Sequence, residues 1–199
     1  MYKNAILILA VLLFSCKKEA TELPKKDNPL IGTWSFVNLD YNVTNVNYIT
    51  NSSGLVVSRI MSPHVYVTQQ NSGELVIDGD LFHYNNIRYI INARLGDYVY
   101  KNTILIDSTF RTVNDTTTFT EKDPYHLLVS DSISVIKGTN DNGSIFRGGI
   151  GDQKYALSGD TLRFTFEGPF VFVIFPDADT TVPSIGAFGR TVWTFVRKK

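Results

Sequence analysis

The chain has 199 residues, and its 19 basic and 19 acidic side chains leave a formal net charge of zero at pH 7. Nucleic-acid-binding domains usually carry a basic patch, so this balance argues against a nucleic-acid partner. The single cysteine excludes an intrachain disulfide and a zinc site built on several cysteines. The length suffices for one domain, and we expect its hydrophobic core alone to stabilise the fold.

The first sixteen residues predict where the protein is located. Lys3 precedes an unbroken apolar run over residues 5–14. A transmembrane helix needs about 20 apolar residues, so this run is too short to span a bilayer and has the length typical of a signal peptide. The run ends in Leu13-Phe14-Ser15-Cys16, and Cys16 is the only cysteine of the chain.

The sequence Leu13-Phe14-Ser15-Cys16 resembles a bacterial lipobox, with an apolar residue at −3 and a small residue at −1 relative to the cysteine. The resemblance implies that residues 1–15 are a lipoprotein signal peptide. It also implies that the Cys16 thiol receives a diacylglycerol and that, after cleavage, the Cys16 amine is acylated, with palmitate as the expected chain. Each buried methylene contributes about 0.8 kcal/mol, so several acyl chains anchor a protein stably. The alternative is an ordinary secretory signal, although a lone thiol is unusual in an exported protein.

Residues 16–29 have the composition of a tether. Charged side chains crowd this stretch, which also contains Pro24 and Pro29 and offers too little apolar surface to fold. We expect it to link the lipidated Cys16 to the folded domain. The residue after Cys16 is Lys17 rather than Asp, and resemblance to well-studied bacterial sorting systems then implies the outer membrane. The expected location is the cell envelope, with the membrane contacted through the lipid anchor.

From residue 30 onward the sequence is typical of β-strands separated by short turns. The clearest strand covers residues 161–167, where Leu162, Phe164 and Phe166 alternate with polar side chains, as in a half-buried strand. Turns are predicted at Asn142-Gly143 and at Ser158-Gly159-Asp160. Further strands are predicted at 34–41, 55–61, 64–69, 74–81, 87–95, 98–106, 127–135 and 191–197.

This pattern predicts an all-β domain over residues 30–199. About ten strands in about 170 residues favour an antiparallel up-and-down β-barrel, and a β-sandwich is the alternative. Closure into a barrel would remove the exposed sheet edges that such a chain otherwise presents.

The folded part opens with Leu30-Ile31-Gly32-Thr33-Trp34 and ends in a strand that contains Trp193 and Arg197. The Gly-x-Trp opening resembles that of lipocalins and fatty-acid-binding barrels, and Gly159-Asp160-Thr161-Leu162 resembles a turn of small bacterial lipocalin-like lipoproteins. The resemblance implies that Trp34 closes the barrel floor, that Gly32 lets the first strand enter without a clash, and that the last strand pairs with the first. It further implies that Arg197 covers Trp34 in a cation–π contact of about 0.5–2 kcal/mol. The Thr-Asp-Tyr motif of many lipocalins is missing.

The sequence contains no recognisable catalytic or metal-binding motif. His64, His83 and His126 are far apart in the sequence, and it has no HExxH, Gly-x-Ser-x-Gly or glycine-rich phosphate loop. We therefore expect no catalytic residues, no metal and no cofactor. Spacing in the sequence does not exclude a site whose residues come together only in the folded chain. Four acidic residues are interpreted as turn residues: Asp97, Asp107, Asp115 and Asp123.

The aromatic content, with 10 Tyr and 13 Phe, indicates a barrel that binds a small apolar molecule in its interior. The sequence alone identifies neither the ligand-binding residues nor the oligomeric state. The run 170–175 lacks alternation and leads into a predicted loop over residues 176–189. This loop supports an alternative function, an interaction module that binds a protein or glycan through its loops. An enzyme is the least supported class.

Overall fold

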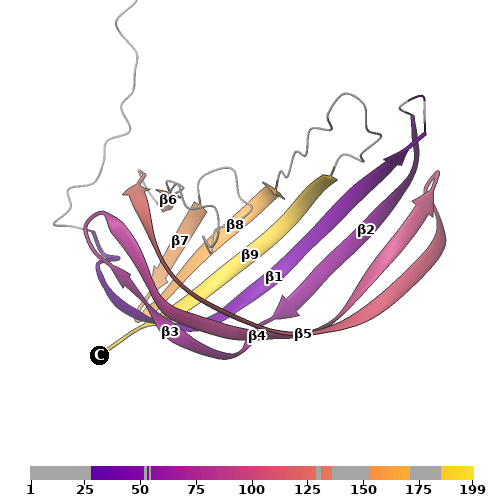
Figure 1. Ribbon diagram of the computed structural model, residues 1–199. Helices are drawn as coiled ribbons and strands as arrows, with labels where there is room; N and C mark the ends of the chain where they lie inside the picture. Colours follow the sequence, from indigo (N-terminus) through magenta and orange to yellow (C-terminus); the bar gives the residue numbers. More distant parts are fainter. Residues whose placement is uncertain (1–27, 52, 54, 129–130, 136–152, 171–184) are drawn as a thin grey trace, which may run out of the picture.

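A computed structural model describes residues 28–51, 53, 55–128, 131–135, 153–170 and 185–199. Within these ranges the chain forms nine strands and no helix. All are antiparallel to their neighbours in one sheet, which curls until β9 pairs with β1, so the fold is all-β, up-and-down and barrel-like, as predicted (Figure 1). The strands are Gly32–Thr50 (β1), Val56–Val67 (β2), Gln69–Ile77 (β3), Leu81–Lys101 (β4), Ile104–Leu127 (β5), Ser132–Val135 (β6), Gln153–Ser158 (β7), Thr161–Phe170 (β8) and Ile185–Arg197 (β9).

Strands β2 and β3 share one position in the ring, between β1 and β4. Thr68 lies at their junction, where its hydroxyl accepts a hydrogen bond from the Leu39 N–H at 2.9 Å and its own N–H donates to the Leu39 carbonyl at 3.0 Å. Beyond this point the five residues 69–73 of β3 oppose only the three residues 36–38 of β1, so β3 is bulged and bends here. Over the residues that the structure describes, the ring therefore has eight strand positions.

Three strands are far longer than the sequence pattern suggested, since β1, β4 and β5 contain 19, 21 and 24 residues. Strand β4 runs without a break through Gly96, which pairs with Phe110. The hairpin turn comes later, at Asn102 and Thr103, which have φ of 48° and 73°. Positive φ at both central residues is the geometry of the tight turns that join twisted strands. The prediction of one strand over 98–106 was therefore wrong.

Strand β5 also corrects the interpretation of the acidic residues. Asp107, Asp115 and Asp123 lie within β5 and Asp97 lies within β4, so none of them is a turn residue. The first half of β5 is exposed on both faces, which removes the alternation that marks a half-buried strand. Conversely, the predicted strand 127–135 contains a turn, because Leu127 at the end of β5 pairs with Ile133 of β6.

Several further expectations differ from the structure or cannot be compared with it. The end of the predicted loop 176–189 belongs to β9, which begins at Ile185. The rest of that loop lies outside the described residues, as do Cys16, the signal peptide and the Asn142-Gly143 turn. The predicted turn at Gly159 is present between β7 and β8, with a φ of 56°.

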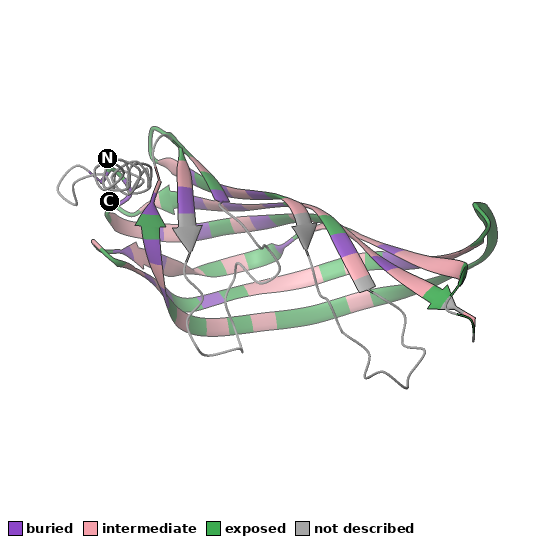
Figure 2. Cartoon of the chain, turned by 90° about the horizontal axis from the view of Figure 1, so that it is seen from above, coloured by how far each residue is buried: buried purple, intermediate pink, exposed green. Residues whose placement is uncertain are grey.

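The hydrophobic core fills one end of the ring. Trp34, Phe82, Phe164 and Phe195 are completely buried, and the rings of Phe82 and Phe164 lie 5.5 Å apart. Leu162 shares this core and is also completely buried, so the alternating face of β8 points inward as predicted. In Figure 2, most residues at the hairpin ends farthest from the C-terminus are exposed. Side chains therefore occupy the interior at the core end.

Candidate functional site

The core end of the barrel is closed around Trp34. Its indole Nε1 donates a hydrogen bond to the Leu30 carbonyl at 2.8 Å, and the Arg197 guanidinium carbon lies 4.2 Å from the ring centre. Gly32 has a φ of 141°, and a Cβ atom there would lie 2.9 Å from the Arg197 guanidinium. Glycine at this position therefore leaves the space in which Arg197 covers Trp34.

The residues that precede β1 are bound to the same end. Asn28, which the sequence assigned to the tether, is only 9% exposed, and its side-chain amide donates to the Tyr125 hydroxyl at 2.6 Å. That hydroxyl donates in turn to the Asp78 carbonyl at 2.7 Å, and burial raises the pKa of Tyr125 to about 12. The folded domain thus already includes Asn28. These contacts make the closed end a packed floor, so a ligand needs another part of the inner face.

Three half-buried tyrosines gather on the inner face beyond this core. Tyr41 of β1 and Tyr66 of β2 are cross-strand partners, and their rings stack with centres 4.9 Å apart. Tyr89 of β4 packs edge-on against Trp193 of β9, with ring centres 6.2 Å apart. We call Tyr41, Tyr66 and Tyr89 the tyrosine cluster. Tyr41 and Tyr89 pack against the core, Tyr66 stacks on Tyr41, and all three keep part of their surface exposed.

Strand alternation explains why these side chains point inward. On β1, Tyr41 lies between Leu39 and Val43, which are 4% and 1% exposed and share its face. On β2, Tyr66 lies between Val65 and Val67, which point to the opposite, outer face and are 60% and 50% exposed. The cluster is therefore set by register, because one step along either strand would place the rings outside.

The phenol groups of the cluster are neutral hydrogen-bonding groups. Burial raises the pKa of all three tyrosines, and the neighbouring phenols raise the pKa of Tyr66 further. A hydrogen bond with Thr117 partly offsets this rise for Tyr89. Tyrosine ordinarily titrates near pH 10, so each group keeps its proton at neutral pH and can donate to a ligand.

Arg111 and His64 lie further along the inner face. His64 of β2 is the cross-strand partner of the inward Val43, and Arg111 of β5 is the partner of Leu95, which is 6% exposed. Cross-strand partners share a face, so both side chains point inward. Burial and the positive charge of Arg111 lower the pKa of His64, while Asp97 raises it. His64 is therefore neutral at neutral pH, and Arg111 supplies the positive charge. The inner face thus passes from aromatic rings near the core to polar groups.

The structure does not bring the three histidines together. His83 contacts Asp78 at the β3–β4 turn, with Nε2 2.7 Å from the carboxylate, and His126 is exposed on β5. In the described part of the chain, no three His, Cys, Asp or Glu side chains are placed to hold a metal ion. The inner-face residues were missed in the sequence because their strands could not be set in register. Their only sequence signal is the alternation around Tyr41 and Tyr66.

Comparisons of the chain with protein-family models, curated proteins and solved structures give no match. Over the described ranges, no helix combines the length and apolarity required to cross a membrane. The fold and inner face define the class: an all-β, barrel-like protein with a packed floor and a partly exposed aromatic inner wall.

Proposed function

We propose that this protein is a non-catalytic binding protein that holds a small, largely apolar molecule against the inner face of its barrel. One observation carries the proposal: the interior is packed at the floor, whereas the tyrosine cluster beyond the floor is only half-buried. Aromatic side chains offer a large apolar contact area together with hydroxyl groups that orient a ligand. The cluster is the proposed contact surface.

The neighbouring polar groups define the other end of this ligand. Arg111 is permanently charged, and His64 stays neutral beside it because its pKa is lowered. Asp97 offsets part of the positive charge. We infer a ligand with an apolar body near Tyr66 and a polar or anionic group toward Arg111.

We further propose that the chain is a lipocalin-like lipoprotein of the bacterial outer membrane. The eight strand positions, the pairing of β9 with β1 and the cover of Trp34 by Arg197 support the lipocalin-like part. The lipobox-like sequence at Cys16 supports the anchor, and the membrane is then a partner through acyl chains on that residue.

Binding of anilinonaphthalene sulfonate, a fluorescent probe with an apolar body and an anionic group, tests the ligand proposal. We expect the full-length protein in a neutral detergent to bind it in the native state, monitored by near-ultraviolet circular dichroism. Tyr66→Ala should weaken binding about tenfold, equivalent to about 1.4 kcal/mol. The neighbour Val65→Ala points outward and should leave affinity unchanged. Equal affinity of the Tyr66 variant and the native protein would contradict the inner-face site.

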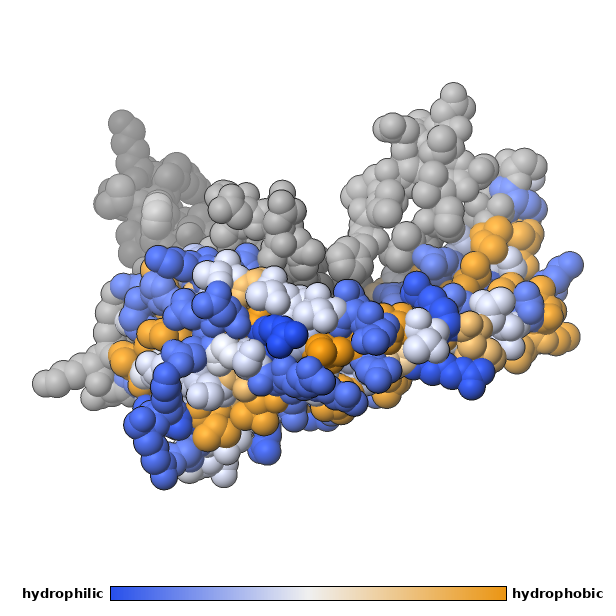
Figure 3. Space-filling view, turned by 60° about the horizontal axis from the view of Figure 1, so that its bottom comes forward, coloured by the Kyte–Doolittle hydropathy of each residue, from blue (hydrophilic) through white to orange (hydrophobic). Residues whose placement is uncertain are grey.

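A partner-binding module remains the second candidate because apolar side chains are exposed at two neighbouring hairpin ends. Leu55 and Val56 at the β1–β2 end are 66% and 57% exposed, and Ile104 and Ile106 at the β4–β5 end are 67% and 57% exposed. Figure 3 shows hydrophobic side chains on this part of the surface. Exposed apolar patches often mark interaction sites. Loss of partner binding on Ile104→Ser with probe binding intact would favour this function.

A further inference from the structure

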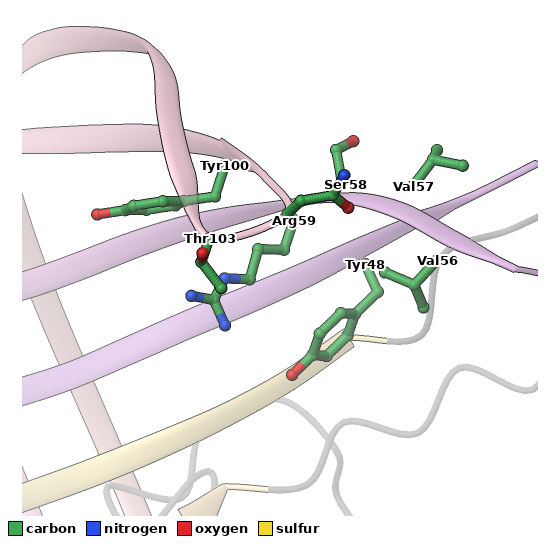
Figure 4. Close-up of a pocket in the computed structure, with 8 residues that line it drawn as sticks. Tyr48, Val56, Val57, Ser58, Arg59, Tyr100 and Thr103 are labelled. Atoms are coloured by element: carbon green, nitrogen blue, oxygen red, sulfur yellow. The ribbon is translucent and has the colours of Figure 1, made fainter.

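A pocket lies between the two hairpin ends (Figure 4). Its volume is about 180 Å³. Tyr48 of β1, Arg59 of β2 and Tyr100 of β4 are successive cross-strand partners, so their side chains lie on one face. Alternation along β1 places Tyr48 on the face opposite to Tyr41. The pocket is lined chiefly by Tyr48, Val56, Val57, Arg59, Tyr100 and Thr103.

The turn of the β4–β5 hairpin forms one side of this pocket. Asn102 and Thr103 both have positive φ, which is uncommon for a β-branched residue such as threonine. Tyr100 leads into this turn, and its ring centre lies 5.2 Å from the guanidinium carbon of Arg59. The Arg59 guanidinium therefore lies near the Tyr100 ring and, in Figure 4, beside Thr103 of the turn.

Arg59 has an unmet hydrogen-bonding group at this site. Its Nε atom is buried, and no acceptor in the described part of the chain lies within hydrogen-bonding distance. A buried donor without an acceptor is costly, and a guanidinium carries its positive charge at every physiological pH. An anion bound in the pocket would supply the missing acceptor, and a carboxylate matches the planar guanidinium geometry.

The remaining walls select the rest of the ligand. Val56 and the Tyr48 ring present apolar surface, and they lie next to each other in Figure 4. An apolar cavity of about 150 Å³ accommodates benzene, so this pocket has room for one ring with a small charged group. We propose that it binds a small organic carboxylate whose anionic group pairs with Arg59 and whose apolar body packs against Tyr48 and Val56. This site is separate from the inner face and does not depend on the proposed function.

Titration with benzoate and its neutral analogue benzamide tests the proposal on the full-length protein in a neutral detergent, with NMR shifts as readout. We expect benzoate to bind at least about tenfold more tightly than benzamide, which lacks the charge. Arg59→Gln should remove this preference, and Arg59→Lys should keep part of it because the charge remains. Folding of each variant is checked by its circular dichroism spectrum and melting temperature.

Arg94 provides a matched control, because its guanidinium carbon lies 4.7 Å from the Phe110 ring centre elsewhere on the outer face. Arg94→Gln should bind benzoate like the native protein, and so should Tyr66→Ala, which alters the inner face. Equal loss at Arg94 and Arg59, no preference for benzoate, or displacement of benzoate by equimolar inorganic phosphate would each overturn the proposal. The last result would show attraction to charge alone.

Discussion

Among single residues, Trp34 and Arg197 form the contact that covers the closed end. Trp34 is completely buried, and large aromatic residues in cores cost about 3–5 kcal/mol on truncation to alanine. We expect this loss of unfolding free energy for Trp34→Ala and a clearly smaller loss for Arg197→Ala. Because the two side chains touch, the losses should not add in a double-mutant cycle measured by urea denaturation. Full additivity would show that the contact contributes nothing.

The ionisation of Asp78 makes the free energy of unfolding depend on pH in the acidic range. Its carboxylate accepts hydrogen bonds from the N–H groups of Asp80 and Leu81 at 2.8 and 2.7 Å and contacts His83. The Asp80 N–H, followed by His83, holds the Asp78 pKa near 2, below its usual 3.8. A carboxyl with a lowered folded-state pKa stabilises above its unfolded pKa and loses this contribution as the pH falls through the folded one.

Asp78→Asn should therefore lower the unfolding free energy at pH 6, by less than about 1 kcal/mol because the group is exposed. The difference from the native protein should shrink between about pH 4 and pH 2, as the native carboxyl takes up its proton. Chemical denaturation at several pH values measures it. A difference that stays constant to pH 2 would mean that the charge of Asp78 has no role.

At the scale of strands, the closing pair β1–β9 requires backbone contact at one glycine. Gly189 has a φ of 156°, and a Cβ there would lie 2.1 Å from the Asn42 carbonyl oxygen. We expect Gly189→Ala to destabilise the protein by about 2–3 kcal/mol through strain and displacement of β1. Gly186, three residues earlier on β9, is the control, because a Cβ there meets no described atom within 4 Å. Similar melting temperatures for the two variants would contradict a tight closing pair.

The sequence predicted the elements that carry a clear period-two pattern. Strand β8 was predicted because Leu162 and Phe164 alternate with polar side chains, whereas the contact of Arg197 with Trp34 was expected only through the resemblance of the Gly-x-Trp opening. Strand β5 was not recognised, because its exposed first half lacks an apolar face. The tyrosine cluster could not be predicted, since it joins residues 41, 66 and 89 through a register that depends on the bulge near Thr68.

At the scale of the whole molecule, the anchor and the domain are predicted to be separable. If Cys16 carries the acyl chains, Cys16→Ala should release the chain from the membrane fraction or leave an uncleaved precursor. Cell fractionation and mass spectrometry of the native N-terminus measure this. A bare, unacylated N-terminal residue on the native protein would contradict the anchor and leave the folded domain unaffected.

The central claim is that the inner face beyond the packed floor is a ligand site. Intermolecular nuclear Overhauser effects between bound anilinonaphthalene sulfonate and assigned side chains test it most directly. We predict contacts from the probe to the ring protons of Tyr66 and Tyr89 and none to the methyl groups of Val65, which lie on the outer face. Contacts to Val65 without contacts to the tyrosine rings would contradict the claim.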